Sequence, residues 1–172
     1  MASLMQVLIA TLDKEEKEYA ALLKLSQKKT PIIIKGDVEK LQNITDEEQV
    51  VIDRLSAIDK EREQAMADIA DVINRDVKTL KLSYLIDMLE KRPEERQALA
   101  EIHDRIKATI GELRLINDQN RVLIEQSLDI VNFNLNLVKS MRQAPETGNY
   151  TRNAGIAGDH MGGTAGGFDA KQ

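Results

Sequence analysis

The stretch from residue 93 to residue 143 decides the fold class, and it reads PEERQALAEIHDRIKATIGELRLINDQNRVLIEQSLDIVNFNLNLVKSMRQ. Pro93 and the two glutamates after it suit a helix start, because proline fits the first turn and acidic side chains complement its positive end. Gly111 is the one weak point, and a helix tolerates it at a cost of about 1 kcal/mol. An unbroken helix here would be about 75 Å long. We therefore expect an all-α, elongated antiparallel hairpin or bundle with coiled-coil-like packing, in which a short helix over about residues 80–91 makes the reversal.

A first long helix is expected over about residues 3–28. Ser3 begins a capping box, and apolar residues then recur at alternating spacings of three and four, with Glu15 and Ser26 as polar interruptions. Pro31 opposes a smooth continuation of the helix. The three isoleucines after Pro31 are therefore expected to form a short apolar plug, with a strand as the competing interpretation.

A second long helix is expected to follow the glycine–aspartate pair at residues 36–37, where the aspartate can act as the N-cap. A further capping signal at Thr45 predicts a bend there, so that a short helix leads into a long one. The heptad seam over residues 41–72 is apolar at eight of its ten positions, and Glu48 and Arg62 are the polar ones.

Glycine divides the chain into two parts, because seven of the nine glycines come after residue 147. The segment 144–172 cannot bury enough apolar surface to offset the entropy of ordering it, so we expect it to be flexible in isolation. The expected organisation is a helical domain over residues 1–143 and a glycine-rich tail over residues 144–172.

Composition excludes several classes of protein. The 172 residues include no cysteine, so a disulfide framework, a thiolate metal site and a cysteine nucleophile are all excluded. The two histidines lie far apart in the sequence and argue against a zinc enzyme. No apolar run approaches the roughly 20 residues of a membrane span. A net charge of −5 argues against nucleic-acid binding. We expect a soluble, acidic, cytoplasmic protein.

No catalytic constellation is evident in the sequence. His103 and Asp104 come closest to a base with its carboxylate, but adjacent helical residues do not face each other, so the pair is expected on an exposed helix face. The glycine-rich tail lacks the flanking strand and helix of a phosphate-binding loop. We therefore expect neither enzymatic activity nor a metal site.

The second half of the last helix carries more apolar surface than this chain is expected to cover. Between residues 123 and 141 apolar side chains lie on more than one face, and a helix that is apolar nearly all round is normally surrounded by protein. Because the first two segments supply only narrow apolar stripes, the surplus face is expected to meet another chain. The alternative is a tighter bundle in which residues 32–34 and the short third helix cover that face.

Polar residues interrupt the seam of the same helix at Asn120, Ser127 and Asn134, with Asn117 nearby. A buried asparagine needs a hydrogen-bond partner and can fix the register between helices. The alternatives are this register role, simple exposure, or a helix whose second half serves a partner.

Residues 113–128, LRLINDQNRVLIEQSL, resemble the signature of the FlgN-type flagellar export chaperones. That signature is two asparagines three apart, then a Leu-Leu/Ile pair, then a later leucine on the long last helix. The matching positions here are Asn117, Asn120, Leu123 and Ile124. Residues 34–41 look like the family's loop between the first two helices, and residues 55–62 resemble its acidic helix ending in arginine.

The resemblance implies a small, acidic, helical and cytoplasmic chaperone without a cofactor. Such chaperones bind the helical C-terminal ends of the hook–filament junction proteins (the hook-associated proteins) and bring them to the flagellar type III export gate. This role agrees with a partner-facing apolar helix, and the recognition mode would be a helix in a groove.

Six residues are the expected client-binding surface: Leu128, Val131, Phe133, Leu135, Val138 and Met141. Phe133 is the expected anchor, because large aromatic side chains dominate interface energies. Tyr150 in the tail is a candidate docking residue for the export gate. The alternative function is a structural coiled-coil protein that dimerises through its last helix, which would require a stable homodimer, whereas a chaperone permits a monomer or a weak dimer.

Overall fold

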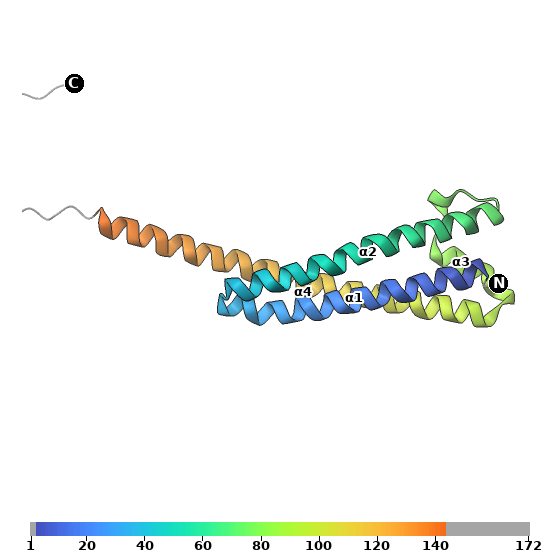
Figure 1. Ribbon diagram of the computed structural model, residues 1–172, viewed down its shortest axis with the longest axis horizontal. Helices are drawn as coiled ribbons and strands as arrows, with labels where there is room; N and C mark the ends of the chain where they lie inside the picture. Colours follow the sequence, from blue (N-terminus) through green and yellow to red (C-terminus); the bar gives the residue numbers. More distant parts are fainter. Residues whose placement is uncertain (1–2, 144–172) are drawn as a thin grey trace, which may run out of the picture. The chain divides into compact units, whose positions relative to one another are not determined.

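The computed structural model describes residues 3–143, and every regular element in that part of the chain is helical. The elements are α1 (Leu4–Lys35), α2 (Val38–Val72), the 3₁₀ turn η1 (Val77–Thr79), α3 (Leu82–Met88), the 3₁₀ turn η2 (Leu89–Lys91) and α4 (Pro93–Arg142) (Figure 1). The predicted all-α fold is confirmed. The predicted tail lies outside the described residues and stays a prediction.

The chain divides into two units, Met1–Asn134 and Leu135–Gln172, and α4 contributes residues to both. The first unit contains the bundle described below. The second is described by itself, and only over its residues 135–143.

Side-chain pairs establish that α1 and α2 form an antiparallel hairpin (Figure 1). Lys14 Nζ lies 2.8 Å from a carboxylate oxygen of Glu61, near the C-terminal end of α2. Further along α1, Ser26 Oγ lies 3.3 Å from a carboxylate oxygen of Glu48, nearer the start of α2. Partner numbers on α2 fall as those on α1 rise, which defines an antiparallel pair.

Side-chain pairs between α1 and α4 show that these two helices are parallel. Asp13 lies 3.5 Å from Arg105, and Ser26 Oγ donates to Asn117 Oδ1 over 2.9 Å. Thr30 Oγ1 in turn donates to Asn120 Oδ1 over 2.7 Å, so the partner numbers rise together. At this register residue 125 of α4 is level with the last residue of α1. Residues 126–134 of α4 therefore have no partner on α1.

Two apolar clusters hold the first unit together. The first combines all three long helices with α3, and its best-buried members include Leu8, Leu12, Leu85, Leu99 and Ile102. The second lies near the α1–α2 turn, and its buried members, Leu25, Ile44 and Val51, come from α1 and α2 alone. The short helix α3 thus completes the bundle at one end, and no element of the described chain does so at the other.

The predicted stop at Pro31 is wrong, because α1 continues through it to Lys35. A proline inside a helix forfeits one backbone hydrogen bond and crowds the preceding turn. Pro31 itself is exposed, while Ile33 is buried and Ile32 packs against the second apolar cluster. Ile32 and Ile33 therefore extend the apolar stripe of the helix, whereas Ile34 is exposed, and the burial of the first two offsets the cost of the proline. The helix ends at Gly36, whose φ of 68° is the left-handed conformation that glycine adopts without strain.

The predicted bend at Thr45 is also absent, because α2 runs unbroken from Val38 to Val72. The Thr45 hydroxyl donates to the Leu41 carbonyl over 2.8 Å, so it bonds within the helix instead of capping a new one. Asp37 does cap α2, accepting from the backbone N–H of Lys40. The predicted third helix over residues 80–91 is resolved into α3 and η2, preceded by the separate turn η1.

Candidate functional site

The last turns of α4 in the first unit expose large apolar side chains. Leu128, Val131 and Phe133 are 56%, 52% and 67% exposed. The tighter-bundle alternative is therefore wrong for these three residues, and α3 packs instead into the first apolar cluster, at the other end of the bundle. The surplus apolar surface predicted from the sequence is present.

In the second unit, the predicted client-binding residues are exposed as well. Leu135, Val138 and Met141 are 53%, 47% and 72% exposed. They lie on the last turns of α4, which ends at Arg142. Tyr150, the candidate docking residue for the export gate, lies outside the described residues.

Asn120 is the one predicted seam asparagine that is buried, with 3% of its surface exposed. Its side-chain amide donates to the Ser26 carbonyl over 2.9 Å, and its Oδ1 accepts from the Thr30 hydroxyl. A buried amide with both ends satisfied costs little and fixes the level at which α4 meets α1. The burial of Asn120 and its two partners on α1 agree with the interpretation that a seam asparagine fixes the register between helices.

The other polar seam residues behave differently. Asn117 is exposed, although its Oδ1 accepts from Ser26. Ser127 is half-buried, and its hydroxyl donates to the Leu123 carbonyl of the same helix over 2.8 Å. Asn134 is exposed. The simple-exposure alternative thus holds for Asn134, and the family-motif residues Leu123 and Ile124 are both half-buried.

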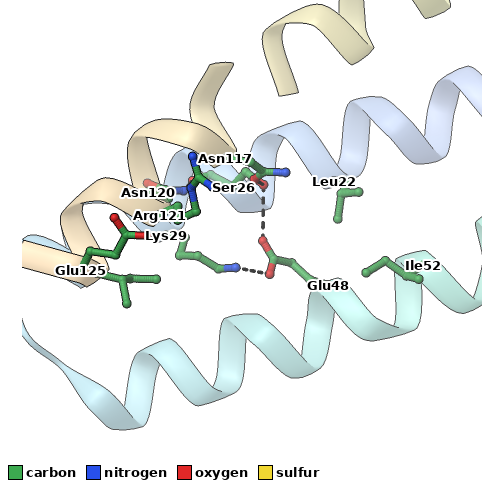
Figure 2. A pocket seen from close by; sticks show the side chains of 10 residues that line it. Leu22, Ser26, Lys29, Glu48, Ile52, Asn117, Asn120, Arg121 and Glu125 are labelled. Atoms are coloured by element: carbon green, nitrogen blue, oxygen red, sulfur yellow. Dashed lines mark hydrogen bonds and ion pairs between the residues drawn. The ribbon is translucent and has the colours of Figure 1, made fainter. Parts of the chain in front are cut away.

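An open groove of about 490 Å³ lies where α1, α2 and α4 meet, near the α1–α2 turn (Figure 2). Its floor comes from α1 and its two walls from α2 and α4, and we refer to it below as the three-helix groove. The residues that line it include Leu22, Ser26, Lys29, Glu48, Ile52, Asn117 and Ile124.

A buried ion pair forms the polar part of this groove. Glu48 reaches from α2 toward Lys29 and Ser26 of α1, as Figure 2 shows. The Lys29 and Glu48 side chains are only 16% and 11% exposed. The sequence indicated Ser26 and Glu48 as polar interruptions of two separate seams. It did not indicate that these two residues meet or that Lys29 joins them.

A second polar contact joins α1 and α2 in the middle of the hairpin. Glu15 is 5% exposed, and its carboxylate lies 3.4 Å from the Arg62 guanidinium, which also pairs with Asp59. Burial raises the pKa of the Glu15 carboxyl, and the charge of Arg62 only partly opposes this. Burial also raises the pKa of Tyr19. Both partners, Glu15 and Arg62, are again polar interruptions of the predicted seams.

The predicted histidine pair forms a weak contact. His103 Nδ1 lies 3.2 Å from Asp104 Oδ1, although neighbouring helical residues were not expected to meet. The Asp104 side chain is 80% exposed and His103 34% exposed, so the pair lies on the helix surface. Among residues 3–143 there is no cluster of three or more histidine, cysteine, aspartate or glutamate side chains able to hold a metal ion. No helix in the same range is apolar and long enough to cross a membrane.

These features define an all-α protein with exposed apolar helix surface at the end of its longest helix. A family model described as FlgN protein matches residues 1–158 of the 172-residue chain. The chain therefore belongs to the FlgN family, which is a family of flagellar export chaperones and is not known as enzymatic. Comparison with curated proteins gave no match, and neither did comparison with solved structures.

Proposed function

We propose that this protein is a cytoplasmic chaperone that binds the C-terminal helices of hook–filament junction proteins and delivers them to the flagellar type III export apparatus. Membership of the FlgN family supports the general role in flagellum assembly. The identity of the client and its delivery to the export apparatus are what we propose beyond this general role.

The observation that carries the proposal is the exposed apolar end of α4. Phe133 is 67% exposed and Leu128 is 56% exposed, in a helix that lacks an α1 partner beyond residue 125. Contiguous apolar surface on a protein marks an interaction site, and an amphipathic helix of a client can cover it. A client held this way would stay soluble and unassembled before export.

The experiment measures the binding of purified junction protein to three variants. We expect Phe133→Ala and Val138→Asp each to weaken binding by about tenfold or more, because central aromatic and apolar anchors contribute roughly 1–4 kcal/mol to interfaces. Leu115→Ala is the matched control, since Leu115 is 59% exposed on the same helix but outside the proposed surface. Unchanged binding by both test variants would reject the site.

The second candidate function is a structural coiled-coil protein that dimerises through α4. The same exposed residues favour it, since a second copy could cover them as a client would. Analytical ultracentrifugation separates the two functions: a dimer that persists at nanomolar concentration and excludes the client supports the structural role.

Delivery to the export gate is proposed to involve Tyr150. The residue lies beyond the described part of the chain, so this proposal depends on the sequence alone.

A further inference from the structure

We infer that the three-helix groove is a docking site for one helix of the client. At the other end of the bundle α3 packs with the three long helices, and the client helix would complete the same four-helix packing at this end. This inference rests on the proposed function and specifies where part of the client lies. The occupant is an amphipathic α-helix with a narrow apolar stripe.

The two ends of the bundle differ in that α3 packs against the long helices at one end only. At the end that contains α3, Leu85 and Leu89 join residues of α1, α2 and α4 in one buried cluster. Residues 80–83, which include the first two residues of α3, line one cavity together with Met66 of α2 and His103 of α4. At this end a short helix of the chain thus packs against the long helices, and the segment that leads into it lies beside both α2 and α4.

Residues of α2 that are seven positions apart lie on the same face of the helix, and this face extends from the end that contains α3 to the end that contains the groove. Met66 and Ile73 pack against the cluster that contains α3. Ile52 lies two heptads before Met66, so it belongs to the same stripe of the helix. Ile52 is nevertheless 45% exposed and lines the three-helix groove.

The facing wall of α4 repeats this arrangement. His103 lines the cavity beside α3, and Asn117 and Ile124 follow it at two and three heptads. Both Asn117 and Ile124 line the three-helix groove instead. The faces that hold α3 at one end therefore continue, without a covering helix, to the other end.

The lining of the groove specifies the chemistry of its occupant. Leu22, Ile52 and Ile124 offer apolar side chains from three different helices, which fits an apolar stripe of one helix. The Lys29–Glu48 pair is almost buried already, so a docked helix must place a hydrogen-bonding side chain, not an apolar one, opposite it. A fully apolar occupant, such as a lipid chain, does not meet this requirement.

The test compares Ile52→Glu with Val50→Glu. Val50 is also a β-branched residue of α2, 54% exposed, but it does not line the groove. The probe is a fluorescently labelled peptide that covers the C-terminal helical segment of a junction protein from the same organism, and the readout is fluorescence anisotropy. We expect Ile52→Glu to weaken binding by about tenfold and Val50→Glu by less than about twofold. Thermal unfolding followed by circular dichroism checks that both variants fold.

A second measurement avoids adding a charge. The chain contains no cysteine, so Ile52→Cys and Val50→Cys each introduce a single thiol. Saturating peptide should slow maleimide labelling of the Ile52→Cys variant and leave that of the Val50→Cys variant unchanged.

The outcomes distinguish this inference from the proposed function. If the wild-type chain binds no client peptide, both are overturned. A second outcome leaves the proposed function standing and overturns the groove assignment. In that outcome the wild type binds the peptide and Phe133→Ala weakens the binding. Ile52→Glu, however, binds as well as Val50→Glu does, and the peptide does not protect the Ile52→Cys thiol.

Discussion

At the scale of single residues, the polar interruptions of the apolar seams meet in pairs. The Ser26 hydroxyl lies 3.3 Å from Glu48, and Glu15 faces Arg62. Both polar positions of the α1 seam therefore meet the two polar positions of the α2 seam. A one-turn slip of the hairpin would place each of these groups against apolar side chains without a partner, at a cost of about 1–3 kcal/mol each. The pairs therefore specify the register of the hairpin.

Glu15 leads to a prediction about pH. Because its pKa is raised above the ordinary value of 4.5, the folded protein holds this proton more tightly than the unfolded chain does. The resulting stabilisation is fully present below pH 4.5 and is lost as the pH rises through the raised value. The wild type should therefore gain stability relative to the Glu15→Gln variant on acidification across this window.

Urea unfolding of both proteins, followed by circular dichroism between pH 4 and pH 8, measures this difference. The groups that face Glu15 are Arg62 and Asp59 of α2 and Tyr19 of α1. Tyr19 has a raised pKa and stays protonated in this range, so the comparison isolates the carboxyl. If the wild type instead loses stability relative to the variant on acidification, the ion pair with Arg62 outweighs burial.

At the scale of the helices, α4 is unusual in continuing through Gly111. An added Cβ at Gly111 would meet nothing within 4 Å. Gly111→Ala should therefore raise the free energy of unfolding by about 0.5–1 kcal/mol, because alanine loses less backbone entropy than glycine in a helix.

Urea denaturation checks this expectation, with Ala108→Gly as the reciprocal control. Ala108 is exposed one turn earlier in the same helix, and its replacement should lower the free energy of unfolding by a similar amount. A Gly111→Ala variant less stable than the wild type would contradict the expectation that the added methyl group meets open space.

At the scale of the whole molecule, the first unit is packed unevenly. One end is closed by α3 and contains the larger apolar cluster, while the end near Gly36 has an apolar cluster from α1 and α2 only and meets α4 through Ser26, Thr30 and Asn120. Polar contacts can be exchanged for equivalent ones at a smaller cost than buried apolar area. The open end is therefore where we propose that a partner helix docks.

The tail gives a prediction at the same scale. Deleting residues 144–172 should leave client binding unchanged, because both proposed client-contacting surfaces lie before residue 144, but it should lower export if Tyr150 docks on the gate. Client affinity in vitro and secreted junction protein in culture medium measure the two effects. Tyr150→Ala in the full-length chain separates loss of the aromatic residue from loss of the tail, and normal export by both variants would reject the docking role.

The sequence by itself determined the helical class, the start of α1 at its capping box, the cap at Asp37 and the unbroken α4, because these depend on spacing and on neighbours within one turn. It also indicated the exposed apolar end of α4, since the other stripes were too narrow to cover it.

Only the tertiary structure decided what depends on contacts between helices. Pro31 is tolerated because Ile33 is buried and Ile32 packs against the apolar cluster of α1 and α2, and no local rule contains this burial. Asn120 is buried and Asn134 exposed, although both occupy the same predicted seam, because α1 ends between their levels. The three-helix groove likewise exists because Ser26 and Asn117, 91 positions apart in the sequence, meet there. Helix packing brings such distant residues together, and periodicity does not.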